Sequence, residues 1–191
     1  MIISLSGKPG SGKSTVAKKL SADLGFERHY IGGMRREMAR QKGMTLTEYN
    51  KWGEEDGNDA DSEFEQFVED LGKTKDNFII ESRTAFNFIP HSIKIFIDVE
   101  PEEGAKRIWK AIEEDSQPNR NEDKNLKSEE DVLTSIHERL RSDDARYKSF
   151  YNIDIFDKNN YDLYLDVTDM TPEQEYNEVL KFVSEKISQS R

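Results

Sequence analysis

The chain has 191 residues, of which 34% are hydrophobic and 35% are charged, and its formal net charge is −11. This length suits one α/β domain with a substantial core, so we expect a single domain over residues 1–191. The negative charge argues against a general affinity for nucleic acid, which requires concentrated Lys and Arg. The chain has no cysteine and no apolar run near the length of a membrane span. We therefore expect a cytoplasmic protein without disulfides or membrane insertion.

The first 74 residues predict a strand followed by helices. Residues 1–6 form a short apolar run typical of a buried strand, and residues 13–24 carry apolar side chains at helical spacing. A second helix is expected from about Met34 to Gln41. Another helical stretch is expected from Thr47 to Leu71, with an interruption near Gly57.

Two further core strands are predicted over residues 78–81 and 93–98, and both end in a carboxylate. Ligands collect at the carboxyl ends of strands in an open parallel sheet. A helix follows Pro101, and a polar stretch over residues 113–130 precedes another helix over residues 129–150. These two helices could form a hinged flap around a mobile loop. A last strand is expected over residues 161–167 and a closing amphipathic helix over residues 172–187.

The strongest motif lies between the first strand and the first helix and matches the full P-loop pattern. Its glycines allow backbone N–H groups to curl around phosphate oxygens, and the helix N-terminus favours negative charge. Lys13 would reach the β- and γ-phosphates of a nucleotide, and the Ser14 hydroxyl would bind Mg²⁺. The predicted ATP-binding residues are Gly7, Lys8, Pro9, Gly10, Ser11, Gly12, Lys13, Ser14 and Thr15.

Arginines at three places favour transfer of the phosphate to a second substrate over hydrolysis. Arginine grips phosphate with a planar, bidentate fork. Arg35 and Arg36 are expected at the start of the second helix, and Arg83 follows the strand that ends at Glu81. A third group contains Arg139, Asp143 and Arg146, whose spacing of four and then three residues places them on one helical face. Surface ion pairs are the alternative interpretation of this spacing.

Two carboxylates at strand ends are candidates for metal binding. Glu81 stands two residues before Arg83 on a strand without other polar residues, and this position favours a role in binding Mg²⁺. For Asp98, which precedes Val99 and Glu100, a turn residue or a helix cap is the better interpretation.

Segments along nearly the whole chain resemble the nucleoside monophosphate kinases, and within them the archaeal-type cytidylate kinases. The similar segments are the P-loop region; residues 32–39, which resemble the family pattern Gly-x-x-Phe-Arg-x-x-Ala; residues 81–83, where the family has Asp-Gly-Arg or Asp-Ser-Arg; residues 94–98; residues 139–154, which resemble the family's lid helix; and residues 161–168.

The resemblance implies a role for several of these residues. Arg36 would hold the α-phosphate of the acceptor, and Arg83 would be a second arginine of the acceptor site. Arg139 and Arg146 would flank the transferred phosphoryl group as catalytic residues together with Lys13, and Asp143 would face the acceptor. The loop after residues 161–168 would lie near adenine.

The expected fold is therefore α/β, a doubly wound parallel sheet of the P-loop NTPase type, similar to nucleoside monophosphate kinases. A helical acceptor-binding insertion is expected around residues 33–72 and a lid around residues 110–145. The expected enzyme is a monomer that transfers phosphate from ATP to CMP or dCMP, with Mg²⁺ held by Ser14 and Glu81. The alternatives are a kinase for AMP, dTMP or a non-nucleotide alcohol, and a nucleotide-hydrolysing switch protein.

Overall fold

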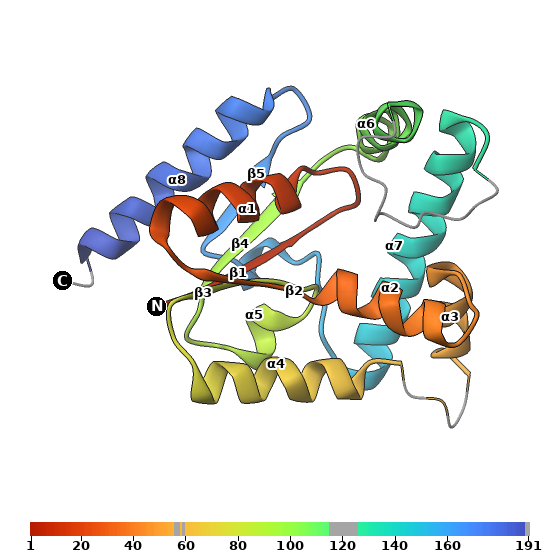
Figure 1. The fold of residues 1–191 in the computed structure, drawn as a ribbon, viewed down its shortest axis with the longest axis horizontal. Coiled ribbons are helices and arrows are strands. Elements are labelled where there is room, and N and C mark those ends of the chain that lie inside the picture. Colours follow the sequence, from red (N-terminus) through yellow and green to blue (C-terminus); the bar gives the residue numbers. More distant parts are fainter. Residues whose placement is uncertain (56–57, 59, 115–125, 190–191) are drawn as a thin grey trace.

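A five-stranded parallel sheet lies at the centre of the structure (Figure 1), a computed structural model that describes residues 1–55, 58, 60–114 and 126–189. The strand order is β2-β3-β1-β4-β5, and every neighbouring pair is parallel. Ile3 of the central strand pairs with Ile79 on one side and with Ile93 on the other. The strands are β1 (Ile2–Gly7), β2 (Glu27–Tyr30), β3 (Phe78–Glu81), β4 (Ile93–Asp98) and β5 (Leu163–Asp166).

Helices cover both faces of the sheet and extend beyond the carboxyl ends of its strands (Figure 1). They are α1 (Lys13–Leu24), α2 (Ile31–Gln41), α3 (Leu46–Trp52), α4 (Ser62–Thr74), α5 (Ala85–Phe88), α6 (Pro101–Glu113), α7 (Glu129–Tyr151) and α8 (Pro172–Gln189), with the short 3-10 helix η2 (Lys158–Asn160) before β5.

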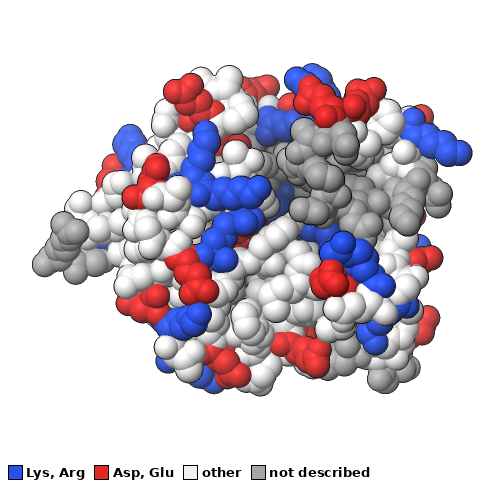
Figure 2. Space-filling model, viewed as in Figure 1, with Lys and Arg blue, Asp and Glu red and all other residues white. Residues whose placement is uncertain are grey.

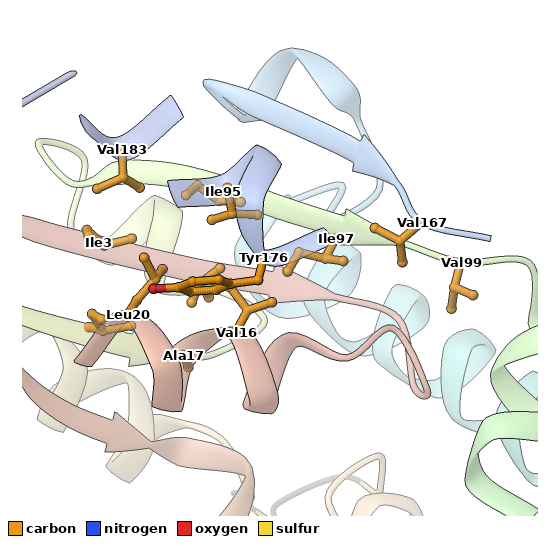
Figure 3. Close-up of a cluster of buried hydrophobic side chains, with 13 residues drawn as sticks. Ile3, Val16, Ala17, Leu20, Ile95, Ile97, Val99, Val167, Tyr176 and Val183 are labelled. Atoms are coloured by element: carbon orange, nitrogen blue, oxygen red, sulfur yellow. The ribbon is translucent and has the colours of Figure 1, made fainter. Parts of the chain in front are cut away.

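Alternation of side chains along the strands divides the apolar residues between two cores. Ile3 and Ile79 point to the face covered by α1 and α8, where Figure 3 shows Tyr176 lying among the side chains of this core. Ile2, Phe78 and Ile80 point to the opposite face. There they pack against side chains of α2, α3, α4 and α5. Both faces of the sheet are therefore buried, as the nearly continuous apolar strands predict.

A separate cluster joins α6 to α7 away from the sheet. It contains Ala105 and Ile108 of α6 and Val132 and Ile136 of α7, all at least 97% buried. Because this contact is independent of the two sheet cores, α6 and α7 form a helical pair that borders the carboxyl ends of the strands.

The α/β class, the parallel sheet and four of its strands are confirmed, and three elements, β2, α5 and η2, were not predicted. The sequence of β2, Glu-Arg-His-Tyr, is polar and lies at the edge of the sheet, and α5 has only four residues. Helix α2 begins at Ile31, so Arg35 and Arg36 lie in its second turn and the prediction that they start the helix is wrong.

The remaining expectations concern the segments between helices. The helical stretch expected from Thr47 to Leu71 is divided into α3 and α4. The expected break at Gly57 and most of the polar stretch at residues 113–130 lie outside the described residues. Within the part of the chain that the structure describes, no helix is both long and apolar enough to cross a membrane.

Candidate active site

The turn between β1 and α1 has the backbone geometry of a phosphate cradle. Gly10 and Gly12 have φ angles of 81° and 82°, in the left-handed region that favours glycine. Gly12 is the N-cap residue of α1, and no side chain caps this helix end. The first N–H groups of α1 are therefore available to an anion, which the helix dipole also favours. Lys13 donates a hydrogen bond of 3.3 Å from Nζ to the carbonyl of Lys8, so its ammonium group folds over the same turn.

Ser14 and Glu81, the two residues predicted to bind Mg²⁺, lie in contact. The Ser14 hydroxyl donates to Oε2 of Glu81 at 2.6 Å, and Arg28 Nε donates to Oε1 at 2.6 Å. Glu81 is only 2% exposed. Two oxygen donors beside a phosphate cradle fit Mg²⁺, which binds through one or two carboxylates together with substrate phosphates. No cluster of three or more His, Cys, Asp or Glu residues occurs in the described chain, so such an ion would depend on the phosphates as well.

Asp98 lies on the other side of the P-loop, where its carboxylate is occupied by protein groups. Lys8 Nζ lies 2.7 Å from Oδ1, and the backbone N–H of Val99 donates to the same atom at 2.8 Å. The Tyr164 hydroxyl donates to Oδ2 at 2.6 Å. Both oxygens therefore bind protein groups, an arrangement that fixes the side chain of Lys8 within the P-loop and favours the interpretation of Asp98 as a turn residue.

Arg83 connects the P-loop to α7. Its Nη1 donates to the carbonyl of Gly7 at 2.6 Å, and its Nε donates to Oδ2 of Asp143 at 2.9 Å. Its Nη2 is buried and has no hydrogen-bond partner among the described residues. Arg83 is thus anchored at two nitrogens and retains donors at the third, at the carboxyl edge of β3 and β1.

Asp143 lies between two guanidinium groups. Besides Arg83, it accepts a hydrogen bond of 3.0 Å from Nη2 of Arg146. Burial raises the pKa of the Asp143 carboxyl, but the positive charges of Arg83, Arg146 and Arg139 outweigh burial and hold the pKa below its usual range. The carboxylate therefore remains ionised and orients both arginines.

Arg146 is the largest of the fully buried side chains, and all three of its nitrogens donate hydrogen bonds. Nε donates to Asp61 at 3.0 Å, Nη1 to Ser142 at 2.7 Å, and Nη2 to Asp143. Asp61 also pairs with Arg35 of α2. The sequence-predicted helical face around Asp143 thus points into the protein and is joined to α2 and α4.

The other two predicted arginines lie at the border of this network. Arg36 donates from Nη1 to the Tyr30 hydroxyl at 2.6 Å and to the carbonyl of Gly32 at 3.1 Å, within its own segment. Arg139 is half-buried on α7, one turn before Asp143. Lys and Arg side chains gather in the middle of the face that shows α1, whereas Asp and Glu lie mainly around its outer part (Figure 2). Although the net charge of the chain is negative, this face therefore carries local positive charge around α1.

A pocket of about 330 Å³ opens beside the P-loop at Gly12. It is organised by Arg107 of α6, whose Nη2 donates to the carbonyls of Val167 and Thr168 at 2.8 and 3.1 Å. This contact fixes the loop between β5 and α8. Other residues lining the pocket are Gly12, Thr15, Val16, Glu103, Lys106, Lys110, Met170, Pro172 and Glu175.

Several residues of the site were missed at the level of sequence. Asp61 and Arg107 each act through a partner distant in the chain, and neither their spacing nor their type marks them. Arg28 also acts through a distant partner, Glu81. Glu175 lies in the first turn of a helix, where an acidic residue is ordinary. A signal was present for Arg28, because charged residues are uncommon in a strand that pairs with a buried neighbour.

Comparison with known proteins identifies the family of the chain. A family model described as an AAA domain matches residues 3–128. The chain is 34% identical over 175 residues to a cytidylate kinase of Natronomonas pharaonis, covering 91% of this chain and 84% of that protein. It is 31% identical over 181 residues to a cytidylate kinase of Haloquadratum walsbyi, covering 95% and 88%. A solved shikimate kinase from Bacteroides thetaiotaomicron shares the fold, with a TM-score of 0.61 and 14% identity over 96% of this chain and 98% of that chain.

The identity to the two cytidylate kinases extends over nearly the full length of the chain. The chain therefore belongs to the nucleoside monophosphate kinases, in the group of the archaeal-type cytidylate kinases.

Proposed function

We propose that this enzyme transfers the γ-phosphate of ATP to CMP or dCMP and releases ADP with CDP or dCDP. The observation that carries the proposal is the position of Arg83, anchored to the P-loop carbonyl of Gly7 and to Asp143 with Nη2 unpartnered. A guanidinium in this position can bind an acceptor phosphate in line with a nucleotide on the P-loop. The names of the relatives support cytosine as the base of the acceptor.

ATP would bind along the N-terminus of α1. Backbone N–H groups of the P-loop would hold the phosphates, and Lys13 would neutralise charge on the β- and γ-phosphates. The pocket beside Gly12 would take the adenosine end. Its planar Arg107 and its apolar Met170 and Pro172 suit an aromatic base.

Ser14 and Glu81 would hold Mg²⁺ at the phosphates. When bound, the ion would supply positive charge that neutralises the negative charge developing on the phosphates during transfer. Arg28 orients the Glu81 carboxylate by donating to Oε1, so that Oε2 faces Ser14. Burial limits the freedom of Glu81, which keeps this arrangement ready before the nucleotide arrives.

The acceptor would bind beneath helices α2, α3 and α4, which we assign to the acceptor-binding insertion at residues 33–72. Arg36 and Arg83 would hold its phosphate. Asp143 would keep Arg83 oriented toward the acceptor. This arrangement places two cations on the acceptor phosphate, whose negative charge would otherwise repel the γ-phosphate of ATP.

Arg139 and Arg146 would stabilise the transferred phosphoryl group, whose charge is spread over three oxygens in the transition state. Arg146 would exchange part of its present hydrogen bonding for contact with this group. The lid, assigned to residues 110–145, would exclude water and so suppress hydrolysis.

The test is an ADP-release assay with Mg-ATP and each of CMP, dCMP, UMP, AMP, dTMP and GMP, together with a control that has no acceptor. We expect CMP or dCMP to raise turnover far above the control. Preference for another monophosphate would overturn the choice of base but retain the arginine roles. Turnover that ignores every acceptor would overturn phosphoryl transfer to a monophosphate and favour a hydrolysing switch.

A further inference from the structure

Glu175 is a buried carboxylate that lines the pocket beside the P-loop. It lies in the first turn of α8 and is only 4% exposed. Its side chain packs against Gly12, where a Cβ atom would lie 2.5 Å from Oε2 of Glu175. The left-handed φ of Gly12 favours glycine, and the absence of a side chain there leaves room for the carboxylate beside the P-loop.

One oxygen of this carboxylate has no protein partner. Oε1 of Glu175 is buried and makes no hydrogen bond with the described residues. Buried polar atoms are rarely left in this state, because an unmade hydrogen bond costs about 1–3 kcal/mol. An unpartnered acceptor inside a ligand-sized pocket points to a hydrogen-bond donor that the ligand supplies.

The surrounding charges do not satisfy Glu175. Arg107 is occupied by Glu103 and by the carbonyls of the loop before α8. Burial raises the pKa of Glu175 to about 7, although the positive charges of Arg107, Lys13 and Lys19 act in the opposite direction. These cations are near enough to influence the carboxyl but make no ion pair with it within the described structure.

We propose that Glu175 selects the donor nucleotide by accepting a hydrogen bond from its nucleoside part, either from the exocyclic amine of adenine or from a ribose hydroxyl. This inference rests on the proposed function, because it requires that the pocket hold the nucleoside of ATP. Phosphate oxygens only accept hydrogen bonds, so the triphosphate cannot donate one to the ionised Glu175 carboxylate. Glu175 thus adds selection of the nucleoside to the phosphate recognition of the P-loop.

The experiment measures binding of four triphosphates by calorimetry in the presence of Mg²⁺. They are ATP, purine riboside triphosphate (which lacks the 6-amino group), 2′-deoxy-ATP and 3′-deoxy-ATP. For the wild type we expect at least one analogue to bind about tenfold more weakly than ATP, because a hydrogen bond to an ionisable carboxyl is lost. The analogue that binds more weakly identifies which group of ATP, the 6-amino group or one of the two ribose hydroxyls, donates to Glu175.

Glu175→Leu removes the hydrogen-bond acceptor. We expect this variant to bind ATP about tenfold more weakly than the wild type does, and to bind the analogue that lacks the donor group with unchanged affinity. Glu175→Gln keeps an acceptor oxygen and should stay within about threefold of the wild type. Glu178→Leu, an exposed glutamate of the same helix, is the matched control.

Two results would overturn the proposal. In the first, the wild type binds all four triphosphates equally, a result that does not depend on whether any variant folds. In the second, Glu175→Leu weakens the binding of all four triphosphates by the same factor, as expected of a purely structural residue. Failure of the wild type to bind ATP at all would instead contradict the proposed function.

Discussion

Asp61 accepts a hydrogen bond of 3.0 Å from Nε of Arg146, which lies 85 residues further along the chain. The same carboxylate pairs with Arg35, so one side chain joins α2, the start of α4 and α7. Asp61 and Arg146 are 3% and 2% exposed. Asp61 therefore compensates the charges of two buried guanidinium groups. Removing one partner of a buried ion pair leaves the other charge uncompensated, which is strongly destabilising.

Asp61→Asn should therefore destabilise the fold. The change retains the shape of the side chain and removes the charge that compensates Arg35 and Arg146. We expect the free energy of unfolding, measured by urea denaturation, to fall by about 3 kcal/mol. Glu63→Gln, an exposed position on the same helix, should change it by less than about 0.5 kcal/mol. Equal stability of the two variants would show that the Asp61 network is not important for folding.

Arg146→Ala should lower kcat by about 100-fold or more while the Kd for ATP stays within about threefold. The reason is that its guanidinium is assigned to the charge of the transition state and not to the ground-state nucleotide. Steady-state kinetics and calorimetry measure the two quantities. Arg141→Ala, an exposed arginine of the same helix, is the matched control.

Because Arg146 is buried, the alanine variant could lose stability, so Arg146→Lys provides a second measurement. Lysine keeps the charge but lacks the planar fork, and we expect kcat to remain at least about tenfold reduced. A folded Arg146→Ala variant with kcat within about twofold of the parent would remove Arg146 from the catalytic role.

Local signals in the sequence were enough to predict the frame of the site. The glycine spacing of the P-loop and the apolar runs of the strands determine local structure. They place Ser14 at the start of α1 and Glu81 at the end of β3, where the two side chains meet at one edge of a parallel sheet. The spacing of Arg139, Asp143 and Arg146 identified one face of α7, although the sequence could not show that this face is buried.

Partner choice across the fold could not be predicted. Nothing near Asp61 in the chain indicates that it lies between Arg35 and Arg146, because α2, α4 and α7 meet only through tertiary packing. The same is true of Glu175, whose position against Gly12 depends on how α8 covers the sheet. The polar β2 was missed because its apolar contacts are limited by its place at the sheet edge.

Glu81→Gln should raise the Mg²⁺ concentration needed for half-maximal activity and lower kcat/KM about 10-fold or more. The amide removes the charge that, with Ser14, suits a divalent cation. Glu81→Asp keeps the charge and should be less impaired. Asp98→Asn is the control, because both oxygens of Asp98 bind protein groups and its loss should not alter the Mg²⁺ dependence. Equal Mg²⁺ dependence of Glu81→Gln and the wild type would contradict the metal role.

Stability should decrease as pH rises from about 4.5 to 7, and Glu65 should account for much of the change. Burial raises the pKa of Glu65 from 4.5 to about 7, although the hydrogen bond from Thr84 lowers it. Between these two pH values Glu65 is ionised in the unfolded chain but keeps its proton in the folded protein. The stability that this group contributes is therefore fully present below pH 4.5 and is lost as the pH rises through 7, a loss of about 3 kcal/mol. Glu175, whose pKa is also raised to about 7, contributes in the same direction.

Urea denaturation at pH 5, 6, 7 and 8 measures this dependence. Glu65→Gln cannot ionise and should remove the contribution of Glu65, while that of Glu175 remains. Glu63→Gln lies on the exposed side of α4 and should follow the wild-type curve. If the curves of Glu65→Gln and the wild type run parallel, Glu65 does not bind a proton on folding. Its ionised carboxylate would then be stabilised in the folded protein by the nearby charges of Arg35 and Arg146.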